Sequence, residues 1–413
     1  MKQTKWLVIA LIVLLSVPTI SQAFDRRKEQ FHTESSYLIF PLPYSIPGIG
    51  EGIMGLGLAG NFLDWYADIY ALAITGDAGG QIIGIDDIHI WPKTVFIDLF
   101  YQNITKAVVN NYEKRGMDTE KDNYNLIELD EVYSTDARIT LSLFDRRFEI
   151  YGSQYFQAIS VPRIRDSKGE IIRDFEEPYE AEARQTAIGM ELDITDDKQD
   201  PLKGFRINVG RNSSPPKEDY DPDFFTLNKS ASFFVPLGEY STIAFNYFAA
   251  DSIVIKKGNT DPALAKAQLN MNCPTGNLVC EKAEQDLINS FIAGRKYGTA
   301  GGLGGQNMLR AYPQGRFQGA HLLYYSAELR YNFSSEVTPF DFWIWQDTST
   351  GIQLALFHEV GAAEDFVEDL AGSTRTSSGL GIRMISASGY VYRFDIASGD
   401  EGSNTTIIFD YPW

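Results

Sequence analysis

The feature of this chain that most restricts its fold is the alternation of apolar and charged residues at every second position. In the segment 322–333, for example, Leu329 and Tyr331 fall on one phase, and Glu328 and Arg330 fall on the other. Successive side chains of a β-strand point to opposite faces, so this pattern predicts strands with one apolar face and one charged face. The charged residues that the alternation assigns to the inner face are Glu328, Arg330, Arg383 and Arg393.

No apolar helix is predicted to carry this chain through a membrane. After residue 23 the sequence contains no long apolar run, although it holds 22 tyrosines and 26 phenylalanines. Only a closed barrel crosses a bilayer without apolar helices, because every backbone polar group must be paired there. Composition therefore leaves two classes open, a transmembrane barrel and a large secreted β protein. The formal net charge of −19 argues against a nucleic-acid partner, since nucleic acid favours basic surfaces.

The first 23 residues have the organisation of a secretory signal peptide. Lys2 and Lys5 supply a positive start, Trp6–Val17 forms a short apolar core, and Ser21–Ala23 provides small residues at a cleavage site. The apolar core is shorter than the ~20 residues of a spanning helix, which disfavours a retained anchor. We therefore expect this segment to be removed on export and residues 24–35 to form a short periplasmic N-terminal segment.

The remainder of the chain is predicted to fold as a series of antiparallel hairpins. About sixteen strand-like segments follow one another, and an even number is what single-chain bacterial barrels require. The sequence thus predicts an all-β fold over 36–413, a transmembrane antiparallel β-barrel of about 16 strands. The predicted strands are 36–44, 50–60, 66–75, 81–90, 94–103, 129–144, 148–161, 184–196, 203–211, 224–237, 241–251, 322–333, 351–361, 375–386, 389–398 and 403–413.

The lengths of the connections support the barrel independently. Connections such as 91–93 and 145–147 are short, whereas the intervening ones are long and polar. Outer-membrane barrels have short periplasmic turns and longer extracellular loops, so this alternation predicts the orientation as well. The connection 334–350 breaks the alternation, and no long amphipathic helix is expected in the mature chain. The predicted extracellular loops are 104–128, 162–183, 212–223 and 252–321.

Two cysteines, Cys273 and Cys280, lie in the longest of these loops. In an oxidising compartment, two cysteines so close together in a turn-rich stretch favour a local disulfide. The alternative, a metal site, would need further His or Cys residues nearby, and the sequence has none there. We therefore expect a disulfide, and neither a metal nor a cofactor.

The same loop contains a motif by which this chain resembles a known family. Residues 304–317 place Arg310 and Tyr312 in a stretch rich in glycine and proline, and the motif Phe357-His358-Glu359-Val360-Gly361 follows in a later strand. Both motifs resemble those of the BamA/TamA-like outer-membrane insertases, the "bacterial surface antigen" family. Ala311 stands where the family usually has glycine.

The resemblance implies that this loop folds back into the barrel and docks its arginine on acidic wall residues. Arg310, followed by Tyr312, would contact Glu359, and Asp395 on a later strand offers a second carboxylate. The alternative is that Arg310 lies at an exposed loop tip, where an ion pair contributes only ~0–1 kcal/mol. The resemblance further implies a barrel-only member, because residues 24–35 are too few for the POTRA modules that the family places before the barrel.

The C-terminus carries aromatic residues at alternating positions. Phe409, Tyr411 and Trp413 are predicted to face outward, where they resemble the signal by which assembly machinery recognises barrel proteins or simply form part of an aromatic girdle. Pro412 cannot donate a strand hydrogen bond, so it weakens pairing where the first and last strands meet. This weakness fits either a seam that opens sideways or a frayed terminus.

The resemblance implies a function in inserting or translocating proteins or lipids at the bacterial outer membrane. Its partners would be outer-membrane lipid, a periplasmic protein and outer-membrane client proteins. A passive surface antigen or plugged pore is the alternative. No enzyme activity is expected: His358 is predicted to face the lipid, as in barrel phospholipases, but the sequence indicates no serine beside it.

Overall fold

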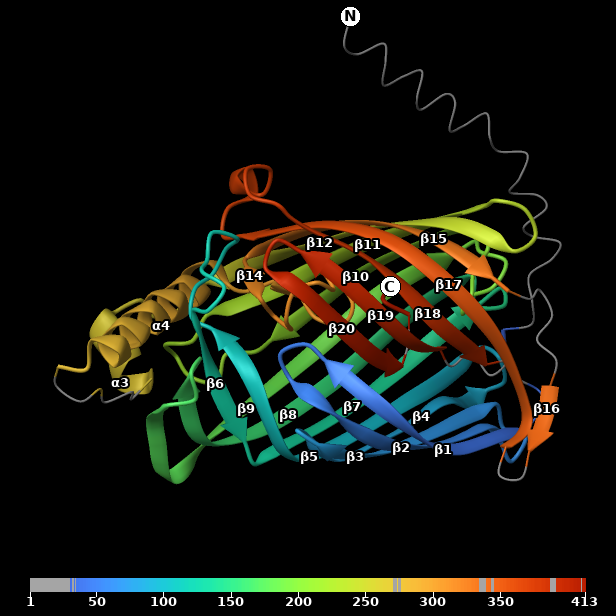
Figure 1. Ribbon diagram of the computed structural model, residues 1–413, viewed down its shortest axis with the longest axis horizontal. Coiled ribbons are helices and arrows are strands. Elements are labelled where there is room, and N and C mark those ends of the chain that lie inside the picture. The colour runs from blue at the N-terminus through green and yellow to red at the C-terminus, as the bar shows by residue number, and fades with distance from the viewer. Residues whose placement is uncertain are drawn as a thin grey trace, which may run out of the picture.

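The computed structural model of this chain is a closed antiparallel β-barrel of sixteen strands (Figure 1). It describes residues 30, 31, 33, 35–269, 273, 276–333, 339–342, 345–386, 391–409 and 411–413. The predicted signal peptide and most of the segment 24–35 lie outside the described residues. Two described residues of that segment reach the barrel: Phe31 is buried against the rings of Phe96 and His89, and the Gln30 side chain accepts a hydrogen bond from the backbone N–H of Lys198 at 2.8 Å.

Consecutive barrel strands pair with one another throughout the sheet. A short strand, β6, precedes β7 and, like β7, pairs with both β5 and β8. The predicted fold, an all-β barrel of about 16 strands, is confirmed. The barrel strands are β1 (Ser36–Ile46), β2 (Gly50–Phe62), β3 (Ala67–Gly76), β4 (Gly79–Trp91), β5 (Val95–Tyr112), β6 (Tyr124–Leu129) with β7 (Glu131–Leu143), β8 (Phe148–Asp166), β9 (Ile171–Asp193), β10 (Gly204–Ser214), β11 (Asp223–Pro236), β12 (Ser241–Lys256), β15 (His321–Asn332), β17 (Trp345–Glu364), β18 (Arg375–Ser386), β19 (Val391–Gly399) and β20 (Gly402–Phe409).

The connections between these strands contain further elements. In the connection 334–350, β16 pairs with the start of β17 at Phe342↔Trp345, so the described part of this connection forms a hairpin that extends β17. The additional elements are α3 (Pro262–Leu269), α4 (Leu278–Tyr297), β13 (Gly301–Leu303), β14 (Phe317–Gly319), β16 (Pro339–Phe342) and the 3-10 helix η1 (Val367–Asp369).

Side chains of the last strands alternate between the outside and the lumen. On β18, Leu380 and Ile382 are 45% and 50% exposed, whereas Arg383 is completely buried. On β15, Leu329 is exposed, and its neighbour Glu328 is completely buried. These strands therefore turn their apolar residues outward and enclose their charges, as the period of two predicts.

Two segments that were predicted as loops are largely strand. β8 and β9 continue through most of 162–183, and only residues 167–170 connect them. β5 and β6 likewise shorten the predicted loop 104–128 to 113–123. The prediction was wrong here because a hairpin that projects beyond the barrel wall meets water on both faces, so its polar composition does not exclude a strand.

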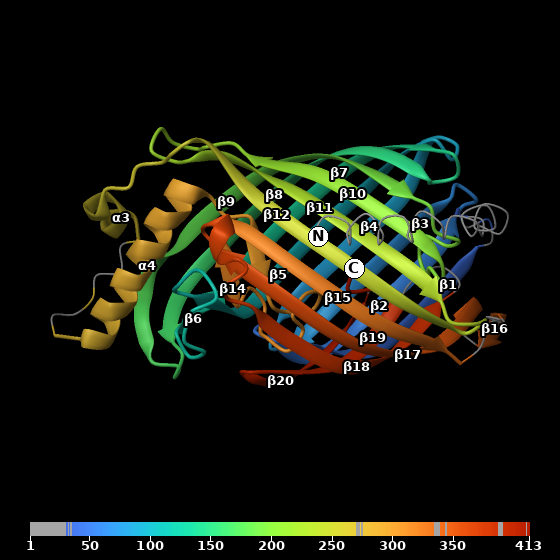
Figure 2. The same cartoon turned by 90° about the horizontal axis from the view of Figure 1, so that it is seen from above.

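The loop 252–321 contains two helices, so the expectation of no long helix was also wrong. Both α3 and α4 lie at one end of the barrel (Figure 2). The N-cap residue of α4 is Asn277, whose side chain accepts a hydrogen bond from the N–H of Cys280 at 3.2 Å. Among the described residues, no helix combines the length and the apolar character needed to span a membrane.

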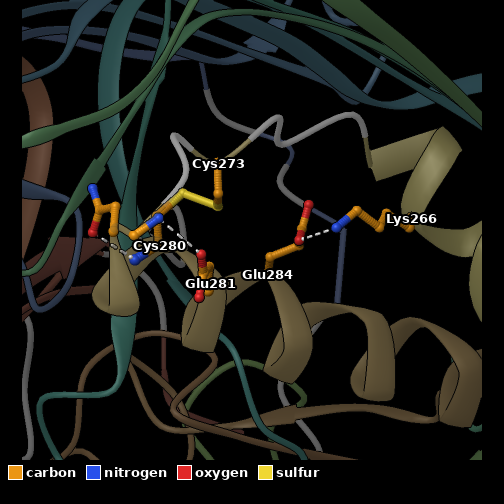
Figure 3. Close-up of a disulfide and its surroundings, with 7 residues drawn as sticks. Lys266, Cys273, Cys280, Glu281 and Glu284 are labelled. Carbon is orange, nitrogen blue, oxygen red and sulfur yellow. Dashed lines mark hydrogen bonds and ion pairs between the residues drawn. A yellow bond between two sulfur atoms is a disulfide. The ribbon is translucent and has the colours of Figure 1, made fainter.

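A disulfide joins Cys273 to Cys280 at the start of α4 (Figure 3). The two Cα atoms are 5.6 Å apart. An ion pair between Lys266 Nζ and Glu284 Oε2, at 2.6 Å, connects α3 to α4. The two helices are thus bound to each other outside the barrel wall.

The barrel closes between its first and last strands along a short seam. β1 and β2 pair from Ser36↔Gly60 to Ile46↔Gly50, which is the full length of β1. Among the described residues, β1 pairs with β20 only at Ser45↔Ile407, and its other end pairs with the start of β17.

The inner face of the first strands is apolar. Leu42 of β1 and Leu56 of β2 are buried there. Tyr392 of β19 and Phe409 of β20 pack against this patch, and the Tyr392 hydroxyl donates to the carbonyl of Pro43 at 2.8 Å. We expected apolar residues outside and charged residues inside, and this expectation fails for β1 and β2. Their inner face is an apolar patch, and aromatic side chains of the last two strands pack against it.

Candidate functional site

The segment between α4 and β15 forms a loop that reaches the inner wall of the barrel. β13 and β14 pair at Leu303↔Phe317 and hold the two ends of the loop together. Inside this neck the chain turns through Gly304 and Gly305, whose φ angles of 102° and 107° favour glycine. A Cβ atom at Gly304 would also lie 2.3 Å from the carbonyl oxygen of Pro313. The glycines therefore allow the loop to fold tightly enough to enter the barrel.

Arg310 lies near the tip of this loop, and its side chain is completely buried. Its Nε donates to Glu359 Oε1 at 2.9 Å, and its backbone N–H donates to Glu359 Oε2 at 2.8 Å. Nη1 donates to Asp395 Oδ2 at 2.8 Å, and Nη2 donates to Glu328 Oε2 at 3.3 Å. The guanidinium stacks on Phe357, with its Cζ 3.3 Å from the ring centroid. The structure thus brings Arg310 together with both carboxylates named from the sequence and with a third.

The same carboxylates receive the other buried arginines of the lumen. Glu328 accepts hydrogen bonds from both Nη atoms of Arg383 at 2.7 Å and from Arg330 Nε at 2.6 Å. Asp395 accepts one from Arg393 Nη1 at 2.6 Å. The four lumen charges identified by alternation therefore belong to the same cluster as the docked loop.

We call this cluster the lumen latch. It comprises Arg310, Arg330, Arg383, Arg393, Glu328, Glu359 and Asp395. Burial by itself lowers the pKa of the Arg310 guanidinium, but Glu359, Asp395 and Glu328 outweigh burial and hold that pKa above its ordinary value. Buried charges are tolerated only when they are paired and hydrogen bonded. The latch is therefore stable as a set, and each of its members depends on the others.

Two glycines of β18 make room for the latch in the barrel wall. A Cβ atom at Gly381 would lie 1.9 Å from Asp395 Oδ1. One at Gly379 would lie 2.4 Å from Cζ of Phe357, the ring on which Arg310 stacks. These inward positions must remain without side chains for the acidic and aromatic partners of Arg310 to keep their places.

Ala311 and Tyr312 fasten the loop tip to the last strands. The Ala311 N–H donates to Ser377 Oγ at 3.1 Å, and the Tyr312 hydroxyl donates to the carbonyl of Thr376 at 3.1 Å. Alanine is accommodated at this position because the facing wall residue, Gly399, has no side chain: a Cβ atom there would lie 3.0 Å from the Ala311 methyl.

Sequence reasoning missed a second arginine of the loop and a tyrosine of the wall. Arg316 is completely buried, contacts Glu401 through Nε and Nη2 at 2.9 and 2.7 Å, and donates to the carbonyl of Thr119 at 2.9 Å. The Tyr324 hydroxyl donates to Glu359 Oε1 at 2.8 Å. The inward phase of β15 could have indicated Tyr324. The alternation of side chains along strands does not indicate where Glu401 and Thr119 point, because both residues belong to connections.

The C-terminal residues do not continue the outward face of β20. Phe409 ends β20, whereas the side chains of Tyr411 and Trp413 lie inside the barrel, so their predicted outward direction was wrong. The Tyr411 hydroxyl donates to Asp200 Oδ1 at 2.6 Å, and both aromatic rings lie within 5 Å of the Arg330 guanidinium, at 4.6 and 4.8 Å from centroid to Cζ. The period of two does not extend past the last paired residue, and a buried guanidinium attracts aromatic faces.

His358 faces outward, and it lies beside a serine that the sequence did not indicate. Its Nδ1 is 2.7 Å from Oγ of Ser378, its cross-strand partner on β18. Cross-strand neighbours depend on strand register, which no local pattern reports. In the described part of the chain, no three residues among His, Cys, Asp and Glu are grouped so as to hold a metal ion.

These features define a class of protein: a sixteen-stranded barrel whose lumen is crossed by its own arginine-bearing loop. No family model matches the chain, and no curated protein matches it. Among solved structures, CdiB from Escherichia coli is similar, with 10% sequence identity and a TM-score of 0.52 over 94% of this chain and 68% of that chain. BamA from Haemophilus ducreyi lacking POTRA domains 1-3 aligns at 12% identity and a TM-score of 0.49, over 91% of this chain and 70% of that chain. At such low identity, the similarity to CdiB supports the barrel fold alone.

Proposed function

We propose that this protein resides in the outer membrane and assists the insertion or translocation of proteins or lipids there. The observation that carries the proposal is the short seam between β1 and β20, which pair at Ser45↔Ile407 among the described residues. Strand edges in a bilayer are held together by their backbone hydrogen bonds. Judged by backbone pairing, this seam is therefore the weakest junction of the wall, although the Tyr392 hydroxyl still donates to the carbonyl of Pro43 there.

The lumen latch supports this role because it stabilises the strands on one side of the seam. Through Glu328, Glu359 and Asp395, Arg310 connects β15, β17 and β19. These strands move as one block, so separation of the wall is confined to the edge of β1. Lipid surrounds the barrel in this proposal, and a periplasmic partner delivers the clients. The role requires no covalent chemistry and no cofactor.

A covalent lock across the seam tests the proposal. Ser45→Cys/Ile407→Cys places two cysteines at directly paired positions of β1 and β20. In liposomes that contain the oxidised double variant, we expect insertion of an added client barrel to stop, and we expect reduction to restore it. Insertion that continues at the wild-type rate with the seam cross-linked would contradict the proposal.

The matched control places the same pair of cysteines across an ordinary strand pair. Ile207→Cys/Ala231→Cys joins β10 to β11, whose pairing runs from Gly204↔Phe234 to Ser214↔Phe224. This variant should insert clients as the wild type does, before and after reduction. It also accounts for any effect of reducing the native disulfide.

The second candidate function is a passive surface antigen or plugged pore without insertase activity. The buried loop favours it, since Arg310 anchors the loop to the inner wall and Arg316 anchors it to the connection between β19 and β20. In that case the seam lock would leave both single-channel conductance and the outer-membrane proteome unchanged.

A further inference from the structure

His358 and Ser378 form a hydrogen-bonded polar pair on the outer barrel face. His358 Nδ1 lies 2.7 Å from Ser378 Oγ, and both side chains are exposed. One row away from the pair, Leu356 and Leu380 face each other across the same two strands and are 47% and 45% exposed. A hydrogen-bonded pair of this kind is unusual on a face that contacts hydrocarbon, because polar groups are costly there.

A hollow in the outer wall begins at His358. It has a volume of about 290 Å³, and its lining includes the rings of Phe233, Phe245 and Tyr325. Ala327 lies between Phe245 and His358 in the same row of cross-strand partners, so the hollow exists where a small side chain is flanked by large ones. A shallow, apolar and aromatic depression of this kind has the chemistry to hold an acyl chain.

The pair lies near the end of the barrel that carries the long loop. Ser378 is the cross-strand partner of Ser398 on β19, and Ser398 is the partner of Ser403 on β20, beside the turn that joins these two strands. Strand ends are where a barrel wall meets lipid headgroups. The hollow therefore places an acyl chain next to a polar pair at the level where that chain joins its headgroup.

The pair itself has one donor to spare. If the Ser378 hydroxyl donates to Nδ1 of His358, the imidazole proton is on Nε2 and is free to donate. If Nδ1–H donates instead, the serine hydroxyl proton is free. In both tautomers one N–H or O–H of the pair is left to donate to an acceptor oxygen outside the barrel.

We propose that this surface is a binding site for an acyl lipid of the leaflet at the loop-bearing end of the barrel. The acyl chain lies in the hollow, and an ester or phosphate oxygen accepts the free hydrogen of the His358–Ser378 pair. The site requires the membrane location of the proposed function but not its insertion activity.

Binding, and not hydrolysis, is the chemistry that the site favours. A serine nucleophile needs backbone N–H groups aimed at the developing oxyanion. His358 and Ser378 lie within the paired stretch of β17 and β18, where backbone N–H groups serve the strand ladder. Within the described part of the chain, no carboxylate contacts His358 to orient its ring.

Lipid retention by the purified full-length protein tests the proposal. The protein is incorporated into nanodiscs of phosphatidylethanolamine, or of phosphatidylethanolamine with lipopolysaccharide, re-extracted in mild detergent and examined by native mass spectrometry. We expect one class of lipid to remain bound to the wild type, and its identity distinguishes phospholipid from lipopolysaccharide. The double variant His358→Leu/Ser378→Ala should weaken retention on the order of fivefold, the effect of one lost hydrogen bond, because either single variant leaves an N–H or O–H that can still donate.

A pair of hollow-filling variants provides the matched control. Ala327→Leu fills the hollow and should abolish retention, whereas Ala73→Leu adds the same atoms to an exposed alanine on β3 and should not change it. Heat-modifiable migration confirms that each variant is folded. Equal retention by all variants would overturn the proposal. So would release of free fatty acid that Ser378→Ala abolishes, because the site would then be hydrolytic. Client insertion by His358→Leu at the wild-type rate would show that lipid binding at this site is not required for insertion at the seam.

Discussion

At the scale of single residues, Arg310 is the position on which the inside of the barrel most depends. Three buried carboxylates converge on it, and each is also bound by another buried group. In Arg310→Ala these carboxylates would keep their burial and lose a shared cation. We expect the free energy of unfolding to fall by about 3–5 kcal/mol, the usual cost of breaking a buried ion pair. Urea titration of the heat-modifiable folded form measures this loss.

A second variant distinguishes loss of charge balance from loss of packing. Arg310→Ala/Glu359→Gln removes one of the stranded negative charges and should recover part of the stability lost in Arg310→Ala. If the single variant unfolds at the wild-type urea concentration, and protease does not cut the loop faster, then Arg310 does not hold the loop in the barrel.

Gly381 gives a more local test of the same site. The methyl group of Gly381→Ala would start 1.9 Å from Asp395 Oδ1 and would displace the carboxylate from Arg310. We expect a destabilisation of about 1–3 kcal/mol, typical of overpacking. Gly55→Ala is the control, because no atom lies within 4 Å of a Cβ atom there. Equal urea midpoints for both alanine variants would show that the space beside Asp395 is not restricted.

At the scale of elements, α3 and α4 are joined to each other by their own cross-links, and α4 also contacts a neighbouring loop through the ion pair of Arg295 with Asp221. The Cys273–Cys280 disulfide and the Lys266–Glu284 ion pair both lie within the two helices and their connection. In Cys273→Ser/Cys280→Ser, the chain between the helices regains conformational freedom. We therefore expect trypsin to cut residues 257–296 several-fold faster, while the urea midpoint of the barrel stays unchanged. A lower barrel midpoint would mean that the helices contribute to closure of the wall.

The strands and the helices differ in how far the sequence reveals them. All sixteen predicted strands correspond to strands of the barrel. In the last strands, charges such as Glu328 and Arg383 are restricted to one phase, which made these strands the clearest in the sequence. The helix α4 escaped prediction because the segment is polar on average and was interpreted as a loop together with its neighbours. The extended hairpin of β8 and β9 escaped for the related reason that water on both faces removes the alternation.

At the scale of the whole molecule, the docked loop lies inside the barrel, where we expect it to obstruct the passage of ions. Replacement of residues 304–316 by a Gly-Ser linker removes both arginine anchors at once. We expect single-channel conductance in planar bilayers to rise well above that of the wild type. Replacement of 262–297 should leave conductance unchanged, since α3 and α4 lie at one end of the barrel (Figure 2). Equal conductance in all three proteins would mean that the loop does not block the pathway of ions.

The candidate site was predictable in its parts and not in its assembly. Alternation placed Glu328, Arg330, Arg383, Arg393 and Asp395 inside, and the family resemblance named Arg310 with Glu359. Neither indicated that one cluster contains all of them, because this depends on which strands lie opposite the loop. The directions of Tyr411 and Trp413 were mispredicted for a physical reason. The alternation of side chains between the two faces of a strand ends where strand pairing ends.

The sequence by itself determined the class of fold, the number of strands and the face of the charged residues on the last strands, because successive side chains of a β-strand point to opposite faces. Only the tertiary structure decided which residues meet. The 2.7 Å contact between His358 and Ser378, the short pairing of β1 with β20, and the second anchor at Arg316 all depend on register and closure. Register and closure are set by the packing of the whole barrel, and no local stretch of sequence contains them.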